Sequence, residues 1–197
     1  MKQIDYWFTP VSPWTYLGND RFHALARRFG AEIAYRPVDF GRIFPASGGL
    51  PLGKRAPQRQ AYRLVELRRW SEFLGLPLIL EPRNFPQPDE PAALTLIAAD
   101  EAGVDMALLT SAVMRALWAE DRPLADWDTL RAVLVACGLD PALTDRAKDP
   151  EIRARRDSFT EQAIAAGVFG APTYVLDGEM FWGQDRLDFL ERALSLA

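Results

Sequence analysis

The first forty residues carry two alternating patterns separated by a helical one. Apolar and polar positions alternate over residues 2–8 and again over residues 32–38, which predicts two β-strands. Between them, apolar positions recur at helical spacing over residues 13–29, and Gly30 marks the end of that helix. The order strand, helix, strand predicts a βαβ unit, in which the two strands run parallel.

The middle of the chain is helical in its pattern almost throughout. Residues 44–51 are rich in glycine and proline and predict a loop, long enough to be either a lid or a linker. From about residue 55 to residue 167 helical spacing dominates, apart from an extended break over residues 76–82 and a proline-dense connector over residues 82–91. After that connector, helices are expected over residues 91–102, 106–119, 126–137 and 150–166.

The strand pattern returns near the carboxyl end. Residues 173–176 and 179–182 flank Asp177-Gly178, a pair typical of a two-residue hairpin turn, and a last helix is expected over about residues 185–196. We therefore expect an α/β sheet domain built from both ends of the chain, with a helical domain inserted between them. A cleft between two such domains is a natural place for a ligand.

Composition narrows the function classes. The chain has 197 residues, of which 49% are hydrophobic, enough to bury a full core. Its formal net charge of -4 gives no reason to expect a concentrated basic surface, so nucleic acid is not an expected partner. Residues 1–5 have no apolar segment behind a basic start, and no stretch is long enough to span a bilayer. We expect a cytoplasmic protein with no membrane partner and a small-molecule substrate.

Redox and metal chemistry have few residues to use. Cys137 is the only cysteine, which excludes an intrachain disulfide and a Cys-x-x-Cys pair, and its helical setting predicts a buried, inert thiol. His23 is the only histidine, and its place beside Phe22 in the first helix predicts a packing role. We expect no metal site and no Ser-His-Asp triad.

Ser12 stands where the first strand gives way to the first helix. A serine before Pro13 suits a helix N-cap, because the hydroxyl accepts a backbone N–H and proline lacks the donor that would go unpaired. An anion placed there meets free N–H groups and the positive end of the helix dipole. Taken alone, this serine is an ordinary cap, and it becomes a candidate active-site residue only together with other segments.

Two later segments have chemistry that suits a peptide-like ligand. Pro172 opens a strand, which indicates either an edge or a cis turn and leaves the backbone of Ala171 free for an external, strand-like partner. Gly183 allows close approach to the backbone, and Asp185 can cap the last helix or accept a hydrogen bond from a ligand ammonium group. Each segment alone also suits a plain strand opening or a plain cap.

Four segments together resemble a known family. They are Ser12 to Leu17, the positions Tyr62, Glu66-Leu67 and Arg69-Trp70, the stretch Val168 to Thr173, and the stretch Glu179 to Leu187. This combination, which runs nearly from end to end of the chain, resembles the 2-hydroxychromene-2-carboxylate isomerases and the kappa-class glutathione transferases. These proteins form a branch of the DsbA-like thioredoxin superfamily, and the last two segments are the most specific to them.

The resemblance implies an α/β fold, a thioredoxin-like (DsbA-like) domain with a large inserted all-helical domain. The expected boundaries are residues 1–53 and 168–197 for the discontinuous thioredoxin-like domain. Residues 54–167 are expected to form the insertion.

The resemblance also implies glutathione as the cofactor. In the family a serine replaces the first redox cysteine, so Ser12 would hold the glutathione sulfur. The backbone at Ala171, before a cis Pro172, would pair with the cysteinyl part. The γ-glutamyl end would be received by Trp182, Gly183, Gln184 and Asp185.

The substrate side departs from the isomerase pattern. That pattern has a lysine where this chain has Phe44, and an Asn-Arg pair where this chain has Gly53-Lys54-Arg55. Basic residues are still present, because Arg55, Arg59, Tyr62 and Glu66 recur at spacings of four, three and four on one side of a helix. Such a face either grips a carboxylate through its arginines or is a solvated charged surface.

Three functions remain open. The resemblance favours a glutathione-dependent isomerase that acts on an aromatic oxo or hydroxy acid such as 2-hydroxychromene-2-carboxylate, through reversible thiolate addition. A kappa-like transferase would instead join glutathione permanently to an electrophile. A redox-inactive module that binds peptides by strand addition beside Ala171 and Pro172 is the third. Relatives with this architecture are often dimers, so a homodimer is compatible with the resemblance.

Overall fold

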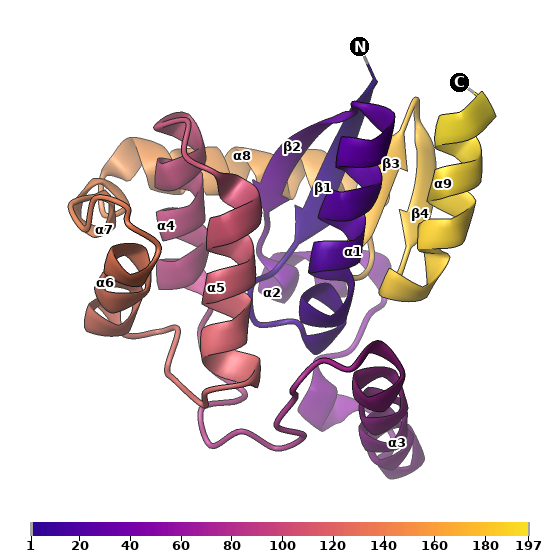
Figure 1. The fold of residues 1–197 in the computed structure, drawn as a ribbon. Helices are drawn as coiled ribbons and strands as arrows, with labels where there is room; N and C mark the ends of the chain where they lie inside the picture. Colours follow the sequence, from indigo (N-terminus) through magenta and orange to yellow (C-terminus); the bar gives the residue numbers. More distant parts are fainter. Residues whose placement is uncertain (1, 197) are drawn as a thin grey trace.

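The computed structural model describes residues 2–196 as a mixed sheet with helices on both faces (Figure 1). The strands are β1 (Gln3–Phe8), β2 (Glu32–Pro37), β3 (Thr173–Leu176) and β4 (Glu179–Trp182). The helices are α1 (Pro13–Phe29), α2 (Phe40–Ser47), α3 (Pro57–Leu74), α4 (Glu90–Glu101), α5 (Met106–Trp118), α6 (Trp127–Ala136), α7 (Leu143–Arg146), α8 (Pro150–Ala165) and α9 (Leu187–Leu196), with short 3-10 turns η1 (Leu52–Lys54) and η2 (Gln184–Arg186). The sheet order is β2-β1-β3-β4, with β1 and β2 parallel and β3 antiparallel to both of its neighbours.

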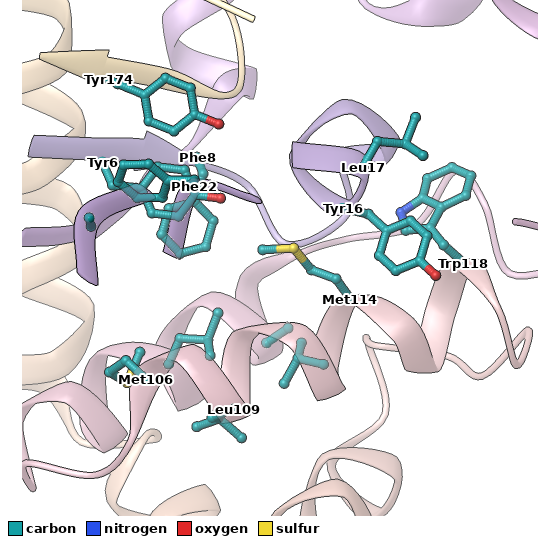
Figure 2. Close-up of a cluster of buried hydrophobic side chains, with 14 of the residues drawn as sticks. Tyr6, Phe8, Tyr16, Leu17, Phe22, Met106, Leu109, Met114, Trp118 and Tyr174 are labelled. Carbon is teal, nitrogen blue, oxygen red and sulfur yellow. The ribbon is translucent and has the colours of Figure 1, made fainter. Parts of the chain in front are cut away.

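Alternation along the strands divides the core between the two faces of the sheet. Tyr6 and Phe8 of β1 lie in the main hydrophobic cluster with Tyr174 of β3 and Phe22 of α1 (Figure 2). The Tyr6 ring centroid is 4.4 Å from that of Phe8 and 5.4 Å from that of Tyr174. Trp7 belongs to a second cluster, which is formed with residues of α2 and α8. The predicted strands and the parallel βαβ unit are therefore confirmed.

Helix α1 begins and ends where its capping residues predict. Ser12 has extended backbone angles, and its hydroxyl oxygen accepts a hydrogen bond from the Thr15 N–H at 3.2 Å. Pro13 occupies the first helical position, where its missing N–H costs nothing. Gly30 ends the helix in the left-handed region, with a φ of 61°, and donates its N–H to the carbonyls of Ala26 and Arg27.

Helix α2 corrects the prediction that residues 44–51 form a loop. The Asp39 carboxylate accepts a hydrogen bond from the Gly41 N–H at 2.7 Å and caps the helix, which ends at Gly48. Phe40 and Ile43 are buried in the second cluster. The free energy gained from this burial outweighs the cost of the helical hydrogen bond that Pro45, which has no N–H, cannot make. Only a short segment between α2 and η1 remains as a connector, which is too short for a lid.

The remaining predictions for the middle and the end of the chain are largely confirmed. The four helices expected after the proline-dense connector match α4, α5, α6 and α8, whereas the four-residue α7 was missed. Asp177 and Gly178 both have positive φ angles, 49° and 84°, as a two-residue hairpin turn requires. The last helix is preceded by η2. Within residues 2–196 no helix is both long and apolar enough to cross a membrane.

The single histidine and the single cysteine take structural positions. His23 is 3% exposed, and its Nε2 lies 2.9 Å from the Tyr35 hydroxyl. Burial lowers the His23 pKa from 6.5 to about 4, so the imidazole is neutral, and the predicted packing role is confirmed. Cys137 follows the end of α6 and is only half-buried, which corrects the expectation of a fully buried thiol, although burial still raises its pKa.

A buried ion pair connects the segment that leads to Ser12 with α4 and α8. The Arg156 guanidinium of α8 donates to Asp89 Oδ1 at 2.6 Å, and both side chains are largely buried. The Thr9 hydroxyl donates to the other carboxylate oxygen of Asp89, and the Thr9 carbonyl accepts from the Ser12 N–H at 3.1 Å. Asp89 therefore anchors the loop between β1 and α1.

Replacing Arg156 tests this anchor. Arg156→Met leaves the Asp89 carboxylate buried without its cation, so we expect the free energy of unfolding to fall by about 3 kcal/mol. Urea denaturation measures the change. Arg153→Met is the matched control, because Arg153 lies on the same helix but pairs with Glu90 at the surface. Equal losses in the two variants would show that the buried pair contributes no more than a surface pair.

His23 gives the fold a defined sensitivity to acid. Its pKa is about 4 in the folded chain and 6.5 in the unfolded chain, so the unfolded chain takes up the proton first as the pH falls. The contribution of neutral His23 to the free energy of unfolding is fully present above pH 6.5, and about 3 kcal/mol of it is lost by pH 4. His23→Gln keeps a polar partner for Tyr35 but does not titrate. Between pH 7 and pH 4 the wild type should therefore lose about 3 kcal/mol more unfolding free energy than the variant does. An equal loss in both proteins contradicts the lowered pKa of His23.

Candidate active site

One cavity of about 590 Å³ brings together segments that are far apart in the sequence. It lies between the start of α1, one face of α3 and the segments on either side of the β3–β4 hairpin, and its size is typical of a small-molecule site. Figure 1 shows α3 standing apart from the layers of the sheet. The lining residues are Trp14, Arg55, Gln58, Arg59, Tyr62, Arg63, Glu66, Trp70, Ala171, Trp182, Gly183, Gln184, Asp185 and Arg186.

Ser12 lies two residues before the cavity-lining Trp14 and is not itself in the lining. Its hydroxyl oxygen accepts from the Thr15 N–H, and a hydroxyl has one donor and two acceptor positions. Nothing in residues 2–196 accepts a hydrogen bond from the Ser12 O–H, so this donor is available. The N-terminus of α1 adds a positive dipole end at the same place. Ser12 can therefore stabilise an anion.

The segment before β3 presents backbone groups to the cavity. The Ala171–Pro172 peptide bond is cis, so of the two interpretations of this proline the cis turn is confirmed. The edge strand is not, because β3 lies between β1 and β4. The Pro172 carbonyl accepts the Gly183 N–H at 2.9 Å, which ties this segment to the turn after β4. In the described part of the chain the backbone N–H and C=O of Ala171 have no hydrogen-bond partner.

The turn after β4 continues the wall that the segment before β3 begins. Gly183 has a φ of 106°, and a Cβ there would lie 2.5 Å from an Asp185 carboxylate oxygen, so glycine is required. Of the two roles predicted for Asp185, the helix cap is excluded, because Asp185 lies inside η2 and α9 begins only at Leu187. Its carboxylate instead pairs with Arg186 at 3.2 Å at the surface. Gln184, by contrast, is only 2% exposed.

Helix α1 packs directly on this turn. A Cβ added to Gly18 would lie 2.7 Å from the Cβ of Gln184 and 3.1 Å from the Tyr174 hydroxyl. Real Cβ atoms do not approach so closely, so a larger residue at this position would force the two elements apart. The absence of a side chain at Gly18 thus sets how closely the cavity-lining turn packs against α1.

Helix α3 supplies a wall with excess positive charge. Arg59, Tyr62 and Glu66 share one face, as predicted, whereas Arg55 lies before the helix, which begins at Pro57. The Glu66 carboxylate accepts from Arg69 at 2.6 Å, and this bond keeps the Glu66 pKa below its ordinary value. Among residues 2–196, no carboxylate pairs with Arg55, Arg59 or the neighbouring Arg63. An acidic ligand would therefore meet uncompensated cations.

Phe44, a predicted substrate-side residue, is not part of the cavity lining. It packs against Phe40, with ring centroids 5.4 Å apart, and the Arg55 guanidinium lies 5.9 Å from its ring centroid. The contact places an aromatic ring beside the arginine and helps to orient it. Phe44 thus contacts a lining residue, Arg55, without lining the cavity itself.

Several lining residues were not predicted from the sequence, above all Arg63. Burial, and next the positive charge of Arg55, lower the Arg63 pKa to about 10, and its buried Nη2 has no partner in the described residues. Its guanidinium lies 5.3 Å from the Phe85 ring centroid. Arg63 follows Arg59 by one helical turn, so helical spacing was the available signal. Trp70 had a weaker signal, its place in the family-like segment.

The chain is similar to known proteins over nearly its whole length. The model of the DSBA-like thioredoxin domain family matches residues 3–195. A 2-hydroxychromene-2-carboxylate isomerase of Sphingobium xenophagum is 35% identical and covers 98% of this chain and 98% of its own length. A glutathione S-transferase kappa 1 of Caenorhabditis elegans is 23% identical over 96% of this chain and 89% of its own. The solved structure of a 2-hydroxychromene-2-carboxylate isomerase superposes with a TM-score of 0.81 at 30% identity, covering 98% of this chain and 94% of that one.

Adding one methyl group tests the contact between α1 and η2. We expect Gly18→Ala to lower the free energy of unfolding by about 1 kcal/mol, since overpacking costs about 1–3 kcal/mol and alanine returns about 1 kcal/mol of helix propensity. Gly53→Ala is the matched control, because nothing lies within 4 Å of a Cβ at that position. Urea denaturation of both variants gives the comparison. A Gly18→Ala protein as stable as wild type contradicts the close contact.

Proposed function

Because this chain belongs to the family of 2-hydroxychromene-2-carboxylate isomerases and kappa-class glutathione transferases, with a DsbA-like thioredoxin domain, we propose that it is a glutathione-dependent isomerase. Its proposed substrate is an aromatic oxo or hydroxy acid, of which 2-hydroxychromene-2-carboxylate is an example. The observation that carries the proposal is the free O–H of Ser12 at the N-terminus of α1, beside a cavity with unpaired arginines.

Ser12 is assigned the stabilisation of a thiolate. A free thiol has a pKa of about 8.5, so most of it is protonated at neutral pH. A hydroxyl donor and a helix N-terminus both favour the ionised sulfur, together by about one to two pKa units, at about 1.4 kcal/mol for each. Ser12 is not assigned a nucleophilic role, because the only histidine, His23, is buried beside Tyr35 and cannot serve as its base.

The residues that would hold glutathione fit a zwitterionic peptide. The unpaired backbone of Ala171 suits the extended cysteinyl part. The turn of Trp182 to Asp185 would receive the γ-glutamyl end, since Gly183 has no side chain in the way and the Asp185 carboxylate can accept from an ammonium group. When bound, glutathione supplies a nucleophilic sulfur that adds reversibly to a conjugated acid, with no net redox change.

The arginine wall is assigned to the substrate carboxylate. Arg55 lines the cavity and has its pKa lowered by burial and by Arg59, and Phe44 lies against it. A guanidinium can bind a carboxylate with two parallel hydrogen bonds. Trp14 and Trp70 line the same cavity and offer apolar surface to an aromatic ring. The arginines thus replace the lysine and the Asn-Arg pair that this chain lacks.

A kappa-like transferase is the second candidate, because a kappa transferase is among the relatives of the chain. The two activities differ in whether glutathione is consumed. The peptide-binding alternative is less favoured, since β3 pairs with β1 and β4 on its two sides and leaves only Ala171 for strand addition. A screen of aromatic hydroxy and oxo acids with catalytic glutathione separates all three: turnover without loss of glutathione supports the isomerase.

Two substitutions at Ser12 test the thiolate assignment. Ser12→Gly removes the O–H but costs the helix cap only a few tenths of a kcal/mol, whereas Ser12→Thr keeps both the O–H and the cap. We expect the pKa of bound glutathione, followed by the ultraviolet absorbance of the thiolate, to rise by about one unit in Ser12→Gly. In Ser12→Thr it should stay near the wild-type value. The same titration curve in all three proteins would remove the role of Ser12.

A further inference from the structure

Arg21 lies on α1 outside the cavity lining, yet it contacts two of the cavity's walls. Its Nη2 donates to the backbone carbonyl of Gln184 at 2.7 Å and also to the side-chain oxygen of the same residue. Its guanidinium carbon lies 5.7 Å from the centroid of the Trp70 ring on α3. Arg21 therefore connects α1, η2 and α3, the three elements that enclose the site.

The chemistry of a guanidinium fixes the orientation of the Gln184 amide. Arginine has donors only, so the amide group must turn its oxygen toward Arg21. The amide nitrogen then faces away from Arg21 with its two donors. Gln184 lines the cavity, and in residues 2–196 nothing accepts a hydrogen bond from this nitrogen.

The surroundings of Gln184 hold that orientation. Gln184 is only 2% exposed, and its Cβ lies against Gly18 of α1. The neighbouring Asp185 is exposed and offers an acceptor on the same cavity wall. One donor and one acceptor side by side match the carboxylate and the ammonium group of an α-amino acid.

We propose that Arg21 is a positioning residue for the γ-glutamyl end of glutathione, because it turns the Gln184 amide so that its N–H groups face the ligand carboxylate. The inference rests on the proposed glutathione function, and it adds a residue that does not touch the ligand. It also gives the site a preference for glutathione over Cys-Gly, the same peptide without its γ-glutamyl end.

Calorimetry with glutathione and with Cys-Gly tests the proposal. Arg21→Met removes the donor, and we expect it to weaken glutathione binding about tenfold, which corresponds to about 1.4 kcal/mol, with Cys-Gly binding unchanged. Gln184→Glu keeps a partner for Arg21, as an ion pair, but removes the amide donor. It should weaken glutathione binding at least as much without loss of stability.

Arg28→Met is the matched control. Arg28 lies on the same helix and pairs with Glu191 at the surface, away from the cavity, so both affinities should stay at wild-type values. If wild type binds glutathione and Arg21→Met keeps the wild-type preference over Cys-Gly, the role of Arg21 falls while the proposed function stands. If wild type does not bind glutathione at all, both fall. A loss of affinity for both peptides in equal proportion shows a general structural role and also overturns the proposal.

Discussion

Helix α1 touches the turn after β4 at Gly18, a position without a side chain, and the candidate site depends on this contact. A Cβ on Gly18 would lie 2.7 Å from the Cβ of Gln184, so even a methyl group there would force the two elements apart. Ser12 caps the same helix, and nothing in the described part of the chain accepts a hydrogen bond from its O–H. One helix therefore sets the spacing between Ser12, the proposed donor for sulfur, and Gln184, the proposed donor for a carboxylate. Arg21, one turn beyond Gly18, donates a hydrogen bond to Gln184, the proposed second donor.

The parts of the fold that could be predicted from the sequence are those that depend on a few adjacent residues. Ser12 and Gly30 define α1, and Asp177-Gly178 defines the hairpin, because caps and tight turns depend on the backbone preferences of a few adjacent residues. The alternation in β1 predicts a strand and also which residues share a face. Helix α2 was missed because its second half overlaps residues 44–51, a stretch rich in glycine and proline. The burial of Phe40 and Ile43 that stabilises the helix depends on tertiary packing.

The candidate site was predictable only in part for the same reason. Sequence motifs identify Ser12, Ala171 and the turn after β4, but periodicity alone does not say which cavity a helix faces. The position of α3 opposite that turn comes from tertiary contacts, and so does the burial of Arg63 beside Phe85. No sequence motif pointed to Arg21, because its proposed role depends on a hydrogen bond to Gln184, which lies far away in the chain.

The proposed site combines Ser12, an uncharged donor for a thiolate, with a wall of arginines that have no carboxylate partner among residues 2–196. In this proposal the protein ionises the thiol of bound glutathione and binds an acid without a redox cysteine, and the single Cys137 lies after α6, outside the cavity lining. A crystal structure of the protein with glutathione tests the account most directly. We expect the sulfur within hydrogen-bond distance of the Ser12 hydroxyl and the γ-glutamyl carboxylate at the Gln184 amide. A tripeptide bound elsewhere, or in this cavity with its sulfur away from Ser12, would contradict it.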